Sequence, residues 1–198
     1  MSSPHPSFTY DASAVVTPAN AVTMGRLLLS PVLILMILAT GPSYPALVLG
    51  TLIALTDSVD GHLARRHGVT RSGAFLDPLA DKVLVLGTMG ALVRVGTLPL
   101  LPVALIAGRE VAISVYRSYW ARRSLAIPAR HSAKVKTVVQ EFAVAFALLP
   151  WLDRHAPGIA IGALWFAVVL TLVTGAQYLL DGQRALSRTG KSEDAHDL

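Results

Sequence analysis

The chain has 198 residues, a formal net charge of +5 and no Cys, and charged residues make up 15% of it, against roughly 25% in an average soluble domain. So few charges cannot cover the surface of a water-soluble fold, and the 53% hydrophobic content excludes a disordered chain. The lack of Cys excludes disulfides, thiolate metal sites and a Cys nucleophile. The sequence also lacks a basic face with interleaved aromatic residues, the pattern that would indicate nucleic-acid binding. The composition therefore predicts an integral membrane protein with no nucleic-acid partner.

The first third of the chain predicts a tail followed by two membrane spans. Residues 1–19 carry no Lys or Arg, and we expect a cytoplasmic segment there. No charge occurs from position 27 to position 56, which is too long for one span of about 20 residues and too short for two. Two prolines and a glycine at 41–45 divide this stretch. The first span therefore starts near Asn20, and the second ends near Arg66.

Four further apolar stretches predict spans at about 73–93, 97–120, 133–151 and 157–180. The first three of these include charged residues, whereas the last has none. Lys and Arg are concentrated on one side of the six spans, and the positive-inside rule makes that side cytoplasmic, with both termini on it. We predict an all-α fold with a six-helix membrane catalytic domain over residues 20–182. A cytoplasmic polar tail is expected over 183–198, and the cell (inner) membrane is the expected location.

Four of the 12 acidic residues lie close together in the sequence, near the cytoplasmic ends of the second and third spans: Asp57, Asp60, Asp77 and Asp81. Their i, i+3 and i, i+4 spacings put each pair on one helix face, so all four carboxylates can converge. Carboxylates at low dielectric repel one another, and divalent metal would compensate them. Ligation by oxygen alone favours Mg²⁺ or Mn²⁺, and two ions could share the four groups. The alternative is that these acids form interfacial salt bridges with Arg65, Arg66, Arg71 or Lys82.

These residues form a recognisable pattern. The segment Asp57-x2-Asp60-Gly61-x2-Ala64-Arg65, followed by Gly73-x3-Asp77-x3-Asp81, resembles the signature of the CDP-alcohol phosphatidyltransferase family. Seven residues separate Arg65 from Gly73, whereas the family pattern has eight, so we expect altered loop contacts and intact metal ligands. The segments LDPLADKVLV, AGREVAISVYR and AKVKT resemble the phosphatidylglycerophosphate synthase branch of this family.

The resemblance implies a role for each matching position. Asp57, Asp60 and Asp77 correspond to metal ligands, and Asp81 corresponds to a residue at the metal site that acts as general base. The positions that match the surroundings of the CDP group are Gly61, Ala64, Arg65 and Gly73, with Thr23 at the edge of the nucleotide pocket. The family relationship also implies two divalent ions, CDP-diacylglycerol as the donor lipid and a homodimer.

The choice of acceptor is expected to depend on basic residues in the inner halves of the fourth and fifth spans: Arg109, Arg117, Lys134 and Lys136. Lys and Arg near span ends can snorkel to lipid headgroups, but Arg109 lies about eleven residues before Trp120, where snorkelling is difficult. A pocket for a phosphorylated acceptor suits these cations better. Glycerol 3-phosphate and inositol phosphate both fit, and phosphatidylglycerol is a further possible acceptor.

Other functions remain open from the sequence. The carboxylates could form a proton or cation relay in a small transporter, although they cluster at one membrane face and do not continue across it. Prenyltransferases that act on diphosphates also use Asp clusters with Mg²⁺, but they usually have more helices and a different Asp spacing. The preferred prediction is an enzyme that makes phosphatidylglycerophosphate and CMP from CDP-diacylglycerol and glycerol 3-phosphate.

Overall fold

The computed structural model describes residues 18–67, 73–121 and 132–194, and the regular secondary structure of this part is entirely helical. Its helices are α1 (Pro18–Thr40), α2 (Tyr44–His67), α3 (Gly73–Arg94), α4 (Leu100–Ala121), α5 (Ser132–Leu148), α6 (Pro150–His155) and α7 (Pro157–Asp194). The predicted all-α class is confirmed, and each of the six predicted spans coincides with a long helix.

Two helix boundaries differ from the prediction. The fifth predicted span, 133–151, is divided, because Leu149 is extended and Pro150 starts the short α6. Proline cannot donate the backbone hydrogen bond that would continue α5. At the other end, α7 does not stop near position 180 but continues to Asp194. About half of the residues in the polar stretch after position 180 have good helix propensity, among them Gln, Arg, Ala and Leu, which favours the extension.

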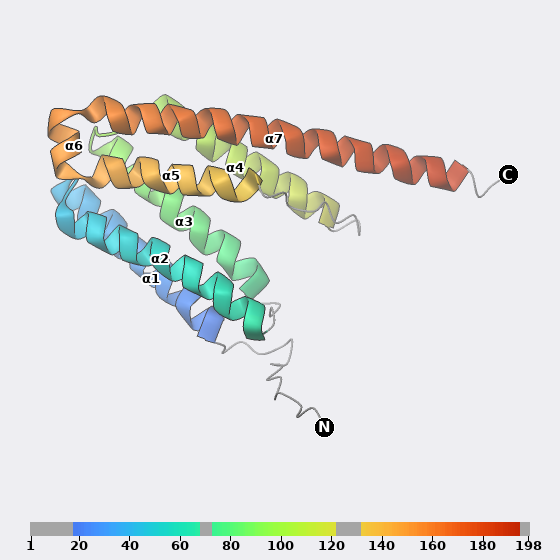
Figure 1. The fold of residues 1–198 in the computed structure, drawn as a ribbon, viewed down its shortest axis with the longest axis horizontal. Coiled ribbons are helices and arrows are strands. Elements are labelled where there is room, and N and C mark those ends of the chain that lie inside the picture. The colour runs from blue at the N-terminus through green and yellow to red at the C-terminus, as the bar shows by residue number, and fades with distance from the viewer. Residues whose placement is uncertain (1–17, 68–72, 122–131, 195–198) are drawn as a thin grey trace, which may run out of the picture.

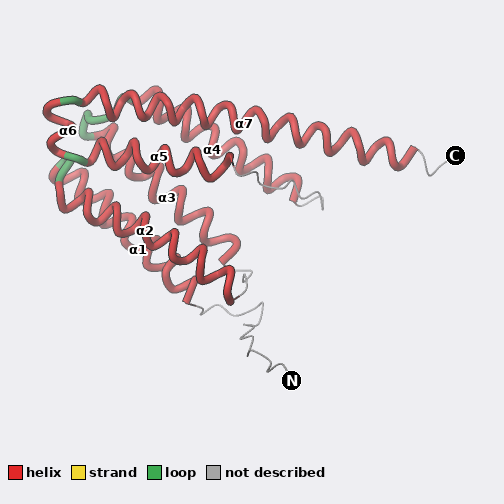
Figure 2. The backbone as a smooth tube through the Cα atoms, in the orientation of Figure 1, coloured by secondary structure: helices red, strands yellow, loops and turns green. Residues whose placement is uncertain are grey.

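The long helices form two groups (Figure 1). In the first group α1 packs against both α2 and α3, and in the second α7 packs against α4 and α5. Contacts of α2 with α5, and of α3 with α4 and α5, join the groups. The helices come together near α6 and diverge toward the end where α2 finishes and α3 begins. The described loops all lie at the α6 end, as Figure 2 shows.

Glycines make two of the turns at the α6 end possible. Gly41 has φ +68° and follows α1, where its N–H bonds to the carbonyl of Ile37 at 2.8 Å. Gly96 has φ +85°, and the next residue, Thr97, bonds back to the carbonyl of Leu92 at 2.9 Å. This left-handed conformation after a helix is unfavourable for residues with a Cβ atom. The glycines therefore fix the turns that return the chain toward the diverging end.

Large aliphatic side chains fill the interior of both groups, and alanines add to it. Leu33, Ile53 and Met89 are fully buried among α1, α2 and α3. Between α5 and α7 the buried positions include alanines, such as Ala143 and Ala167, which allow the two backbones to approach closely. Close van der Waals packing is the main force between helices where lipid replaces water outside.

Large apolar side chains also cover the outside of the molecule. Exposed positions include Leu28 and Leu35 on α1, Val115 on α4 and Phe166 on α7. Over the described residues, two segments are long and apolar enough to cross a membrane, Val22–Thr40 and Pro157–Leu180, with mean hydropathies of 2.1 and 2.2, while Tyr44–Thr56 is apolar but shorter. An apolar exterior of this kind indicates a membrane protein, because water would disfavour it.

Candidate functional site

The four aspartates of the sequence pattern lie on two helices, near the ends that face away from α6. Asp57 and Asp60 are in the last part of α2, and Asp77 and Asp81 are in the first part of α3. The helical backbone therefore gives each pair the shared face that the spacing predicts. Of the four side chains, only that of Asp81 lies within the described part of the structure.

The CDP-binding positions predicted on these helices also lie outside the side chains that the structure describes: Gly61, Ala64, Arg65 and Gly73. With so few carboxylates included, the described residues contain no group of three or more His, Asp or Glu side chains that could hold a metal ion. The predicted metal ligands and nucleotide contacts therefore stay predictions.

Asp81 pairs with a buried arginine on the first helix. Nη1 of Arg26 lies 2.5 Å from Oδ1 of Asp81, and the arginine side chain is 1% exposed whereas the aspartate side chain is 43% exposed. Thr23, one helical turn before Arg26, is also buried. The tight packing of α1 against α3 brings these residues together. The carboxylate is thus held on its α1 side and still reaches the surface of the site.

A second charged cluster connects α4 with α5. Glu110 accepts a hydrogen bond from Nη1 of Arg109 at 3.0 Å, and its carboxylate also pairs with Nζ of Lys136. All three side chains are between 10% and 14% exposed. Two of the predicted acceptor residues, Arg109 and Lys136, therefore meet at one carboxylate. The side chains of the other two, Arg117 and Lys134, lie outside the described residues, although their helices are described.

Lys82, expected from the sequence only as a possible partner for the aspartates, joins this cluster from α3. Its Nζ donates to Oγ of Ser114 on α4 at 2.5 Å, and Ser114 in turn donates to the backbone carbonyl of Glu110 at 2.6 Å. The sequence feature that could have indicated a role for Lys82 at the site is its position directly after Asp81. Neighbouring positions on a helix point about 100° apart, so α3 turns Asp81 toward α1 and Lys82 toward α4.

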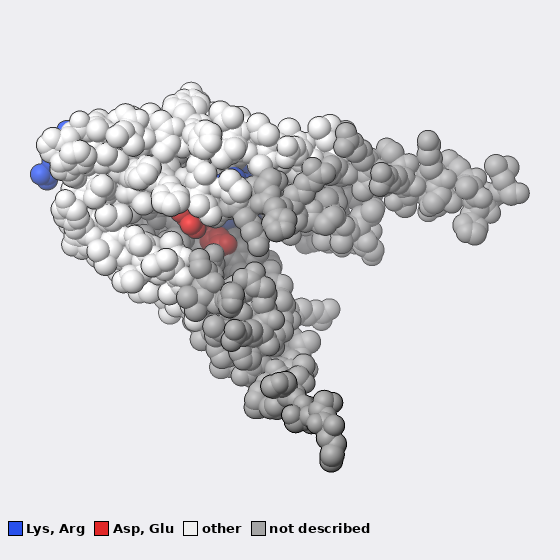
Figure 3. All heavy atoms as spheres, viewed as in Figure 1, with Lys and Arg blue, Asp and Glu red and all other residues white. Residues whose placement is uncertain are grey.

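Among the described side chains of this second cluster, cations outnumber carboxylates. Lys82, Arg109 and Lys136 supply three positive charges, and within the described part of the cluster Glu110 is the one carboxylate paired with them. Figure 3 shows acidic and basic atoms next to each other where the two helix groups diverge. An excess of cations in a largely buried position favours an anionic ligand such as a phosphate.

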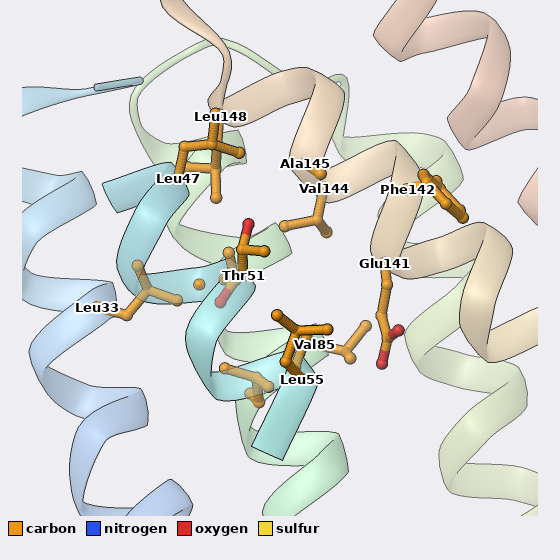
Figure 4. Close-up of a pocket in the computed structure, with 14 residues that line it drawn as sticks. Leu33, Leu47, Thr51, Leu55, Val85, Glu141, Phe142, Val144, Ala145 and Leu148 are labelled. Atoms are coloured by element: carbon orange, nitrogen blue, oxygen red, sulfur yellow. The ribbon is translucent and has the colours of Figure 1, made fainter. Parts of the chain in front are cut away.

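An apolar cavity of about 220 Å³ lies between α2, α3 and α5 (Figure 4). Its lining comes from α2, α3 and α5, with Leu33 added from α1, and aliphatic side chains such as Leu55, Val85 and Leu148 dominate it. Glu141 is the one carboxylate in the lining. A cavity of this character can accept a hydrocarbon chain but offers few groups to a polar ligand.

Comparisons with known proteins agree with the sequence pattern. The family model described as CDP-alcohol phosphatidyltransferase matches residues 16–173. The chain is similar to a probable phosphatidylglycerophosphate synthase of Mycobacterium tuberculosis, with 36% identity over 167 residues, 81% of this chain and 79% of that protein. It is also similar to two proteins named CDP-diacylglycerol–glycerol-3-phosphate 3-phosphatidyltransferase. The one from Rickettsia bellii is 34% identical over 80% of this chain and 91% of its own length, and the one from Bacillus subtilis is 33% identical over 84% and 95%.

Proposed function

The chain belongs to the CDP-alcohol phosphatidyltransferase family, and on that premise we propose that it moves the phosphatidyl group of CDP-diacylglycerol to glycerol 3-phosphate. The products are phosphatidylglycerophosphate and CMP. The names of the relatives from Rickettsia bellii and Bacillus subtilis carry this donor and this acceptor. The family predicted from the sequence is confirmed. The activity preferred from the sequence uses the same donor and acceptor that the names of these relatives give.

The observation that carries the choice of acceptor is the convergence of Arg109 and Lys136 on Glu110. Glycerol 3-phosphate differs from an unphosphorylated alcohol by a phosphate group, and such a group needs cations in a partly buried site. Lys82 adds a third positive charge and directly follows Asp81 in α3. The acceptor phosphate would therefore be held beside the helix that carries the proposed base.

The proposed reaction needs one proton transfer and one displacement. The Asp81 carboxylate accepts the proton of the acceptor hydroxyl, whose oxygen forms a bond to the β-phosphorus of the donor. The bond from that phosphorus to the CMP oxygen breaks, and CMP leaves with the electron pair. Arg26 fixes Asp81 on one side, so that the carboxylate is oriented before the acceptor arrives. Orientation matters here because an ordinary carboxylate is a weak base.

Two divalent metal ions, Mg²⁺ or Mn²⁺, are part of the proposal. Asp57, Asp60, Asp77 and Asp81 would hold them, and the carboxylate-only donor set fits hard cations of this kind. The exposed fraction of Asp81 agrees with a carboxylate that faces a ligand. When bound, the ions would neutralise the pyrophosphate and make CMP a better leaving group. Gly61, Ala64, Arg65, Gly73 and Thr23 would surround the CDP group.

The donor lipid also needs a place for its hydrocarbon chains. We assign one acyl chain to the apolar cavity between α2, α3 and α5 (Figure 4), whose lining is mainly aliphatic. The cavity involves both aspartate-bearing helices, α2 and α3, so a chain held there would leave its headgroup near the proposed site.

We further propose that all six long helices span the cell (inner) membrane, with both termini and the active site on the cytoplasmic side. The support is the distribution of Lys and Arg along the sequence together with the apolar exterior of the bundle. Helices α3, α4 and α5 contain internal charges, which explains why length and hydropathy alone identify fewer spans than the six proposed here. A homodimer is the assembly that family resemblance implies.

The decisive experiment is CMP release by the purified protein in detergent with CDP-diacylglycerol, divalent metal and a panel of acceptors. We expect release with glycerol 3-phosphate and none without an acceptor. Release with inositol phosphate or phosphatidylglycerol, but not with glycerol 3-phosphate, would assign the chain to another acceptor. No release with any acceptor, together with ion flux in liposomes free of CDP-lipid, would replace the proposal by a transporter.

A further inference from the structure

Helix α7 carries a polar face inside its uncharged membrane stretch. Thr174 and Gly175 lie three and four residues after Thr171, so both are its neighbours on one side of the helix. The hydroxyl of Thr174 accepts a hydrogen bond from Nη2 of Arg109 at 3.0 Å, and that of Thr171 accepts one from Gln140 at 2.9 Å. The uncharged stretch of α7 therefore bonds to polar side chains of both α4 and α5.

Gly175 lies directly under the guanidinium of Arg109. A Cβ atom added to this glycine would come within 2.9 Å of Nε, 3.4 Å of Cγ and 3.6 Å of Nη2. By contrast, a Cβ added to Gly158 or Gly162 on the same helix would meet no atom within 4 Å. The absence of a side chain at position 175 is thus what lets Arg109 lie against the backbone of α7.

From these contacts we infer that Thr174 and Gly175 are positioning residues that orient Arg109 toward the acceptor phosphate. The inference rests on the proposed function, because the phosphate toward which α7 orients the Arg109 guanidinium is that of the proposed acceptor. Glu110 and Thr174 each take one hydrogen bond from the guanidinium, and Nε is buried with no hydrogen-bond partner among the described residues. A guanidinium has five N–H donors.

This arrangement leaves one N–H on each terminal nitrogen of Arg109. Two parallel N–H groups suit two oxygens of one phosphate, which is the geometry that Arg provides and Lys does not. Because Glu110 fixes one terminal nitrogen and Thr174 the other, rotation of the guanidinium would require breaking both bonds. The two remaining N–H groups are thereby oriented before the acceptor binds, which lowers the entropy cost of binding.

The test uses two substitutions on α7 that act on Arg109 in different ways. Gly175→Ala introduces a methyl group against Nε, and the flexible arginine can shift without moving the helix. Thr174→Val removes the acceptor hydroxyl at nearly constant shape, whereas Thr174→Ser retains it. The matched control is Gly162→Ala, the same change on the same helix in open space.

The measurement is acceptor-dependent CMP release, with the KM of each substrate determined separately. We expect Gly175→Ala and Thr174→Val to raise the KM for glycerol 3-phosphate about 5-fold or more. The KM for CDP-diacylglycerol should stay within about 2-fold, and Thr174→Ser and Gly162→Ala should resemble the wild type. A general packing defect would not separate the two KM values, nor would it be rescued by serine.

Each other outcome counts against the inference. An unchanged KM for glycerol 3-phosphate, or an equal rise in both KM values, overturns the positioning role. The proposed function stands in that case if the wild type releases CMP with glycerol 3-phosphate. If Gly175→Ala does not fold, the valine and serine variants at position 174 decide the question. A wild type with no acceptor-dependent release overturns the proposed function, and this inference with it.

Discussion

Arg26 on α1 donates a hydrogen bond from Nη1 to Oδ1 of Asp81 on α3 at 2.5 Å, across 55 residues of sequence. The arginine is almost completely buried, so its charge depends on a nearby anion. Asp81 therefore has three functions in our proposal: it compensates a buried cation, it helps to hold the metal ions and it accepts the proton of the acceptor hydroxyl. Substitution can separate the first function from the other two.

Replacing Asp81 by Asn should remove the base while retaining an oxygen that accepts from Arg26. We expect turnover to fall by about 100-fold or more, the lower end of what a general base contributes. The thermal unfolding midpoint should fall less than in Asp81→Ala, because Asn removes the negative charge beside Arg26 but retains a hydrogen-bond acceptor. Asp81→Ala should abolish turnover and lower the midpoint further, because it removes both. CMP release and thermal unfolding in detergent measure the two effects. Near-normal turnover of Asp81→Asn would refute its role as base.

The sequence predicted the helices and part of the site, but not how the helices are rotated. Arg109 and Lys136 were expected to lie together because both occupy the inner halves of their spans, and they meet at Glu110. The contact of Arg109 with Thr174 was not predicted. In a membrane helix both the lipid-facing and the inward faces are apolar, so hydrophobic periodicity does not reveal which face of α7 points inward.

The same limit applies to Asp81. Its spacing from Asp77 predicted a shared face and a metal site, and its position next to Lys82 was visible in the sequence. The span lengths place Arg26 near the same membrane face as the aspartates, but they do not show that the first span supplies the partner of Asp81. Long-range pairs of this kind depend on the packing of α1 against α3, which no local pattern encodes.

Removal of divalent metal should stop the reaction. Treatment with a chelator is expected to reduce CMP release to background, and added Mg²⁺ or Mn²⁺ should restore it, because the pyrophosphate charge would otherwise be uncompensated. Asp57→Ala should abolish turnover and prevent this recovery. The matched control is Asp153→Ala, which removes a carboxylate on α6 at the opposite end of the bundle. Full activity in chelator, or in Asp57→Ala, would contradict the metal site.

Loss of the Lys136 charge should weaken binding of the acceptor more than binding of the donor. Lys136→Met keeps the length of the side chain but removes one of the three cations near Glu110. We expect the KM for glycerol 3-phosphate to rise about 10-fold, corresponding to roughly 1.4 kcal/mol for one charged contact with phosphate. Arg154→Gln is the control, because this exposed arginine lies on α6. A similar rise in that variant would indicate an effect of overall charge rather than a local phosphate site.

Two leucines on α1 test whether the outside of the bundle faces lipid. Leu33 is 1% exposed and contributes to the core between α1, α2 and α3, whereas Leu35 is 65% exposed. Leu33→Ala should lower the free energy of unfolding by about 1–3 kcal/mol, less than the loss in a soluble core, because lipid outside reduces the transfer term and leaves mainly the cavity term. Leu35→Ala removes as many atoms but opens no cavity, and we expect a change within about 0.5 kcal/mol. Denaturant unfolding of both variants in the same detergent measures the difference. Equal destabilisation would mean that Leu35 is also buried, against a partner helix or a second copy of the chain.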